Sequence, residues 1–156
     1  RLKVASTRDY ETIKEALTRN EMRAYVIDDS TYLMQFENFD RASEKGYDKY
    51  TQMAVHFKEL LDAAKFTSPD TIVYFFMHPE LDSFGNEKPK TIGKMLDEKL
   101  TVEGCFDIVL YCQDHKFYTQ ANGQSTAKSP EGMFELEIPN DLKFVDSAIR
   151  DYYGMG

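Results

Sequence analysis

The chain has 156 residues, of which 42% are hydrophobic, and a formal net charge of −8 at pH 7. This length and composition suit a single domain spanning 1–156 with a packed core, and they exclude wholesale disorder. The negative charge excludes a surface that is basic throughout, so any contact with nucleic acid needs a local basic patch. No apolar run is long enough for a membrane span, and we expect no membrane partner.

The beginning of the chain predicts a short strand at residues 2–5, followed by a helix. Ser6 or Thr7 is a suitable N-cap for this helix, and Asn20 a suitable end. The chain starts with Arg1 and has no signal peptide at this end, so we interpret it as a piece of a longer protein.

Two apolar runs, residues 24–28 and 71–78, predict strands that are buried on both faces. Between them, residues 30–47 are rich in aromatic side chains and predict irregular structure. Residues 50–64 carry apolar side chains at helical spacing, which predicts an amphipathic helix with one buried stripe.

The rest of the chain predicts a long loop at 79–93, a short helix at 93–99 and a third strand at 105–112. A hairpin turn at 114–115 and a second loop at 122–133 follow. The tail predicts a helix that begins after Asn140 or Asp141. The only cysteines, Cys105 and Cys112, lie in the predicted third strand. Their spacing suits neither a disulfide nor a CxxC metal site, so we expect buried free thiols in a reducing compartment.

Strands that alternate with helices predict an α/β domain with a mostly parallel sheet flanked by helices and a C-terminal antiparallel hairpin. Ligands of such folds bind beyond the carboxyl ends of the strands. Asp28 and Asp29 end the first long strand and His78 ends the second, so we expect them to share one edge of the sheet.

Asp28 and Asp29 are the candidate metal-directing acids. Neighbouring side chains of a strand point to opposite faces, so we expect one of them to bind Mg²⁺ through a water while the other orients water or a loop. Mg²⁺ prefers few carboxylates together with water and phosphate oxygens. The alternative is that both acids simply cap the turn after the strand.

His78 is the candidate partner of a γ-phosphate or of an attacking water, the alternative being that it satisfies backbone groups of the following loop. We expect His56 and His115 to be structural or solvent-facing. The histidines show neither HxxxH nor HExxH spacing, which argues against a zinc site.

Two loops carry lysines that can bind phosphates of a nucleotide or of a nucleic-acid strand: Lys88, Lys90 and Lys94 in one, and Lys128 in the other. The alternative is that they are solvated surface lysines. The sequence contains no GxxxxGK[ST] phosphate loop, since Gly93-Lys94-Met95 lacks the hydroxyl residue.

Four stretches of the chain resemble, in consistent order, a family of bacteriophage P-loop ATPases with a RecA-like core, AAA-type nucleotide-binding proteins linked to single-strand annealing recombination. These stretches are FDRASEKGYDKYTQMAVHF (39–57), KTIGKMLDEKLTVEGCFDIVLYC (90–112), FYTQANGQSTAKSPEGMF (117–134) and IPNDLKFVDSAIRDYY (138–153). In this family a strand, the phosphate loop and its helix come first, so we expect that segment before Arg1.

The resemblance implies a role for each candidate residue. Asp28 resembles the Walker B aspartate that orients Mg²⁺, Asp29 the following acid that polarises the attacking water, and His78 the sensor on the adjacent strand. Lys128 resembles a basic finger that reaches ATP, in the same subunit or in a neighbour. The loop with Lys88, Lys90 and Lys94 resembles a segment that contacts DNA.

The resemblance therefore implies ATP and Mg²⁺ as cofactors, hydrolysis of ATP, single-stranded DNA as a partner, a homo-oligomer, and the cytoplasm of an infected bacterial host as the location. Two alternatives remain at this point. The first is a non-catalytic, truncated ATPase module for protein association or strand binding. The second is a metal nuclease, for which the sequence offers no second acid at paired spacing.

Overall fold

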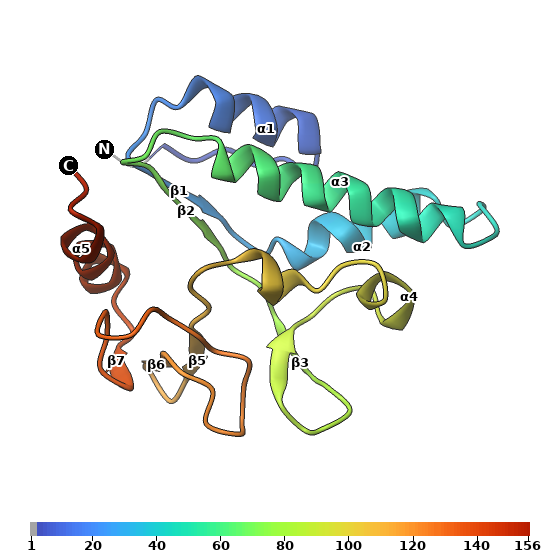
Figure 1. Ribbon diagram of the computed structural model, residues 1–156. Coiled ribbons are helices and arrows are strands. Elements are labelled where there is room, and N and C mark those ends of the chain that lie inside the picture. Colours follow the sequence, from blue (N-terminus) through green and yellow to red (C-terminus); the bar gives the residue numbers. More distant parts are fainter. Residues whose placement is uncertain (1–2) are drawn as a thin grey trace. The chain divides into compact units, whose positions relative to one another are not determined.

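The computed structural model describes residues 3–156 and shows a mixed α/β protein (Figure 1). The chain divides into two compact units, one formed by the residues up to His78 with Lys90–Leu100, the other by Pro79–Pro89 with Thr101–Gly156. The mixed α/β class is confirmed, but the prediction of a mostly parallel sheet is wrong. Among the described residues the sheets are small, and only one strand pair is parallel.

The first unit contains one two-stranded parallel sheet and most of the helices. Its elements are α1 (Tyr10–Arg19), β1 (Ala24–Ile27), α2 (Thr31–Asp40), α3 (Asp48–Lys65), β2 (Ile72–Phe75) and α4 (Lys94–Asp97). β1 and β2 pair directly, from Ala24 opposite Ile72 to Ile27 opposite Phe75. In Figure 1, α1 and α3 run side by side next to this strand pair.

The core of the first unit lies on one face of the sheet. Leu17 of α1, Leu33 of α2 and Leu60 of α3 pack with Ile27, and alternate side chains of both strands join this cluster. Val26, which points to the opposite face, is 48% exposed. Burial on both faces is therefore a wrong prediction for β1, because the core-forming helices gather on a single face.

The N-cap of α1 is Asp9, not Ser6 or Thr7. The Asp9 carboxylate accepts hydrogen bonds from the Thr12 amide at 3.0 Å and from the Thr12 hydroxyl at 2.6 Å. Thr7 instead accepts from the Asp9 amide. Of the strand predicted at 2–5, Leu2 lies outside the described residues and 3–5 have no regular structure.

Helix α3 confirms the amphipathic helix predicted at 50–64, with both ends slightly extended. Its apolar stripe is the most buried part of the unit: Met53, Ala54, Phe57, Leu60 and Leu61. The prediction of irregular structure at 30–47 is wrong, because α2 occupies 31–40. The packing of Leu33 and Met34, 6% and 0% exposed, holds α2 in place without a side-chain cap.

The second unit contains two antiparallel sheets, a 3-10 turn and one long helix. Its elements are β3 (Pro79–Leu81), β4 (Glu87–Pro89), η1 (Val102–Cys105), β5 (Tyr111–Gln113), β6 (Lys116–Tyr118), β7 (Glu137–Pro139) and α5 (Leu142–Tyr153). The pair β3–β4 forms a hairpin inside the region predicted as a loop. The core of the second unit includes Val102, Ile138 and Val145.

The C-terminal hairpin is confirmed. β5 and β6 pair antiparallel around Asp114 and His115, whose φ angles of 51° and 61° suit a two-residue hairpin turn, and β7 adds a third strand. The predicted strand 105–112 is shorter and later than expected, because Cys105 belongs to the 3-10 turn. Both cysteines are free, as predicted, but Cys112 is exposed rather than buried. Asp141 caps α5, as predicted.

A polar cluster links the three long helices of the first unit. Glu37 Oε1 lies 2.7 Å from His56 Nδ1 and 3.0 Å from Arg41 Nη1, and the His56 ring lies 6.2 Å from that of Tyr10. The buried Tyr10 hydroxyl has no hydrogen-bond partner among the described residues. Burial, and then the charge of Glu37, raise the pKa of Tyr10 well above its usual 10.0.

Replacing Tyr10 by Phe should make the free energy of unfolding fall less steeply as the pH rises in the alkaline range. Because the pKa of Tyr10 is raised in the folded state, Tyr10 releases its proton near pH 10 only in the unfolded chain. The contribution of protonated Tyr10 to the free energy of unfolding is therefore complete below that pH and is lost as the pH rises. Urea unfolding at increasing pH should therefore show a shallower decline for Tyr10→Phe than for the wild type, and no loss of stability at pH 7. Tyr47→Phe, which changes a side chain that is 72% exposed, should keep the wild-type slope. Identical slopes for Tyr10→Phe and wild type would contradict the assignment.

Candidate functional site

The candidate site lies where β1 and β2 end on the same edge of the parallel sheet. The Phe76 amide donates to the Ile27 carbonyl at 3.0 Å, and the Phe76 carbonyl accepts from the Ser30 amide at 2.9 Å and from the Ser30 hydroxyl at 3.0 Å. Ser30 is fully buried. These bonds continue the strand register past both strand ends, so residues 28–30 and 76–78 are held side by side.

Asp28 and Asp29 follow β1 in a turn rather than in the strand itself. Asp29 has a φ of 51°, and its amide donates to Asp28 Oδ1 at 3.0 Å. The strand alternation used to predict that the two acids point to opposite faces does not apply to this pair, because the strand ends at Ile27. Both carboxylates belong to one exposed turn.

Asp29 and His78 form the contact that joins the two strand ends. His78 Nε2 lies 3.0 Å from Asp29 Oδ1, and the two side chains are 53% and 61% exposed. A carboxylate that holds one imidazole nitrogen orients the ring and leaves the other nitrogen for a further partner. The sequence predicted that these residues share an edge, and the structure brings them into direct contact.

Tyr32, in the first turn of α2, is part of this edge and was missed from the sequence. Its ring centroid lies 5.6 Å from that of His78, with the ring planes at 83°, an edge-to-face contact. Because residues 30–47 were predicted to be irregular, the position of Tyr32 on a helix beside His78 was not anticipated. The spacing of Tyr32 and Phe36 by one helical turn was the available signal.

Lys90 belongs to the same edge through its backbone. The Lys90 amide donates to the His78 carbonyl at 2.7 Å, and the Lys90 carbonyl accepts from the Thr31 hydroxyl at 3.3 Å. Thr31 is fully buried, whereas Lys90 is exposed. The first unit therefore places the backbone of Lys90, a basic residue with an exposed side chain, directly beside His78.

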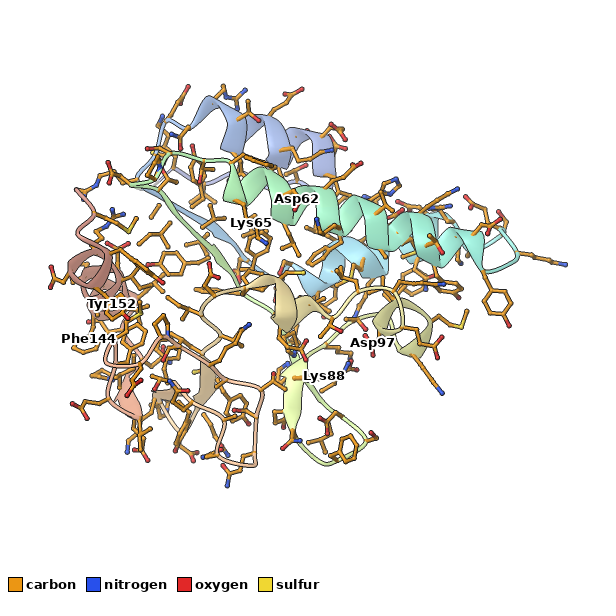
Figure 2. All side chains as sticks on the ribbon, viewed as in Figure 1. Asp62, Lys65, Lys88, Asp97, Phe144 and Tyr152 are labelled. Atoms are coloured by element: carbon orange, nitrogen blue, oxygen red, sulfur yellow. The ribbon has the colours of Figure 1, made fainter. Side chains whose placement is uncertain are left out.

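The other predicted lysines lie elsewhere. Lys94 is exposed at the start of α4. Lys88, which is labelled in Figure 2, and Lys128 belong to the second unit. Lys88 Nζ lies 3.2 Å from Glu80 Oε1 across the β3–β4 hairpin. The Lys128 backbone pairs with Val109 in both directions, at 2.9 and 2.8 Å. Their roles toward ATP or DNA stay predictions.

The acids at this edge can hold Mg²⁺ only together with further oxygen ligands. Residues 3–156 contain no group of three or more His, Cys, Asp or Glu side chains arranged for a metal ion. Mg²⁺ is commonly held by one or two carboxylates with waters and substrate phosphates, and Asp28 and Asp29 offer such a carboxylate set in an exposed turn. A metal bound there would depend on a phosphate ligand.

Comparison with protein-family models, with curated proteins and with solved structures finds no match to this chain. Over residues 3–156, none of the helices combines the length and the apolar character that crossing a membrane requires. The geometry of the site is therefore the basis for inferring its chemistry.

Replacing Ser30 by Ala should loosen the tie between the two strand ends. The variant loses the hydroxyl bond to Phe76 but keeps the amide bond, so the carbonyl stays satisfied and the cost should be about 1 kcal/mol. Urea unfolding measures this difference. Ser43→Ala, at an exposed position, is the control and should leave stability unchanged. Equal stability of Ser30→Ala and wild type would show that the hydroxyl bond contributes nothing.

Proposed function

We propose that the first unit is the Mg²⁺-nucleotide edge of a RecA-like ATPase that acts in phage DNA recombination or single-strand annealing. The observation that supports this proposal is the contact of Asp29 Oδ1 with His78 Nε2, at 3.0 Å, across the ends of two paired parallel strands. Ligand sites of open α/β sheets lie at this edge. The stretches quoted above supply the resemblance to the family.

Each side chain has a role that its position allows. Asp28 would hold Mg²⁺ through a water, and bound Mg²⁺ neutralises charge on the β- and γ-phosphates. Asp29 holds the His78 ring and accepts a hydrogen bond from the attacking water. As an imidazolium, His78 would donate one ring N–H to Asp29 and the other to the γ-phosphate, and the exposed Lys90 would add a positive charge to the same edge. In the proposed reaction, water attacks the γ-phosphorus in line, the bond from this phosphorus to the β–γ bridging oxygen breaks, ADP leaves, and the proton of the water passes to the phosphate product.

The charge of the site makes binding depend on a cation. Asp28 and Asp29 place two carboxylates in one turn, and a nucleoside triphosphate brings several further negative charges. Lys90 compensates only part of this charge, so phosphates should approach the edge only when a divalent cation lies between them and the acids. Nucleotide binding without Mg²⁺ should therefore be much weaker than binding with it.

Replacing Asp28 by Ala should abolish Mg²⁺-dependent nucleotide binding. The 156-residue chain is titrated into a fluorescent ATP analogue, once with Mg²⁺ and once with excess chelator. Protein concentrations up to the millimolar range allow weak binding to be measured. Wild type should bind only with Mg²⁺, and Asp28→Ala in neither condition. Glu15→Ala removes an exposed carboxylate from α1 and should bind like wild type. Unaltered Mg²⁺-dependent binding by Asp28→Ala would remove the metal role of this residue.

A second candidate function is a non-catalytic, truncated ATPase module that serves protein association or binds a single DNA strand. It is favoured by the sequence itself, which contains no GxxxxGK[ST] and therefore none of the amides and lysine that surround a β-phosphate in P-loop proteins. Hydrogen bonds to charged groups contribute about 1.5–3 kcal/mol each, so their loss weakens nucleotide binding strongly.

Phosphate release from ATP separates the two candidates. If the edge is catalytic, the chain should release phosphate with Mg²⁺, faster with single-stranded DNA, and His78→Ala should lower turnover by about 100-fold, as expected for loss of a group that contacts the transferred phosphoryl. His56→Ala, which changes a histidine of the Glu37 cluster, is the control. Absence of phosphate release by the wild type under all of these conditions would favour the non-catalytic module, whereas tight Mg²⁺-dependent nucleotide binding would contradict it.

A further inference from the structure

Two aromatic rings lie exposed on the first two turns of α2. Tyr32 and Phe36 are each 40% exposed, and their ring centroids are 5.9 Å apart with the planes inclined by 37°. Two rings in contact along one side of a helix present a partly exposed aromatic surface at little cost in side-chain entropy. The first unit leaves this surface open to solvent.

The Tyr32 end of this surface is continuous with the candidate site. Tyr32 packs edge-to-face against His78, whose imidazole is held by Asp29. The other end is fixed by Arg8, whose guanidinium carbon lies 5.5 Å from the Phe36 ring centroid and whose Nη1 lies 3.5 Å from Asp40 Oδ1. One side of Phe36 is thus occupied by a cation, and Tyr32 is the ring that faces the phosphate-binding edge.

We propose that Tyr32, supported by Phe36, is the surface on which the base of the bound nucleotide stacks. This inference rests on the proposed function, because it assumes that the phosphates bind with Mg²⁺ at Asp28 and Asp29. In a nucleotide only the ribose and the phosphate chain separate the base from the terminal phosphate. If the phosphates bind at Asp28, Asp29 and His78, the base must therefore bind to a surface that adjoins these residues. Every base has a π-face, so a Tyr platform selects for a base without selecting which one.

The surroundings of the two rings favour a nucleotide over a protein partner. Cores of protein interfaces are depleted of charged residues, whereas this surface is bounded by Asp28 and Asp29 at one end and by Arg8 and Asp40 at the other. Two rings between charged groups match a ligand that is itself aromatic at one end and charged at the other.

The test compares Mg²⁺-ATP with Mg²⁺-tripolyphosphate, which carries the same kind of phosphate chain without a base. Both are titrated by calorimetry against the 156-residue chain, Tyr32→Ala, Tyr32→Phe and Phe39→Ala. Tyr32→Ala should weaken ATP binding about tenfold and leave tripolyphosphate binding unchanged, since stacking on one ring contributes at this level. Tyr32→Phe keeps the ring and should restore ATP affinity. Phe39→Ala removes a 75% exposed ring from the next turn of α2 and should bind both ligands like wild type.

The outcomes separate this inference from the function on which it rests. If wild type binds tripolyphosphate and ATP equally well, or if Tyr32→Ala weakens both to the same extent, base stacking on Tyr32 is overturned while the phosphate edge stands. If wild type binds neither ligand with Mg²⁺, both proposals fall. A (dT) oligonucleotide that loses affinity with Tyr32→Ala while ATP does not would assign the ring to a DNA strand and overturn the nucleotide assignment.

Discussion

The Phe76 carbonyl is the point on which the candidate site depends. It accepts the amide and the hydroxyl of Ser30, while the Phe76 amide donates to the Ile27 carbonyl. Strand pairing alone ends at Ile27 and Phe75, one residue before Asp28 and three before His78. Without the additional bonds, the two chain segments could diverge after the strands. With them, Asp29 and His78 come within 3.0 Å although 48 residues separate them in the sequence.

The packing of the first unit supports the two strands that end at this edge. A two-stranded sheet is only marginally stable by itself and needs a covering layer. Here α1, α2 and α3 gather on one face, and the fully buried Phe57 and Leu60 of α3 lie at the centre of that layer. Phe57 also meets Phe75 of β2 at a centroid distance of 6.5 Å. The longest helix that the structure describes, α3, therefore supports the strand that leads to His78.

The sequence predicted well those features that depend on local patterns. The period of α3, the stop at Asn20, the turn at Asp114 and His115, and the cap at Asp141 all follow from side chains within a few residues of each other. Asp28, Asp29 and His78 were predicted to share an edge because apolar runs precede them and parallel strands end on one edge. The direct contact between Asp29 and His78 confirms that part of the geometry.

Features that depend on tertiary contacts were not predictable in this way. Helix α2 has no side-chain cap, and it forms because Thr31, Leu33 and Met34 are buried by the rest of the unit. Tyr32 was missed for this reason. The conformation of Asp29, with a φ of 51°, removes the strand alternation on which the separation of the two acids was argued. Lys90 reaches the edge through backbone bonds to His78 and Thr31, which no sequence spacing encodes.

The charges at this edge narrow what the site can bind. Two adjacent carboxylates repel an anionic ligand, yet Lys90 and the aromatic pair of Tyr32 and His78 lie beside them. A neutral apolar ligand would gain from the rings but would leave the acids without a role. A free metal ion would find too few ligands, because the described residues contain no group of three metal-binding side chains. A ligand with an aromatic end and a cation-bearing phosphate end would use all of these groups at once, and for this reason we propose a Mg²⁺-nucleotide as the ligand rather than either of its parts.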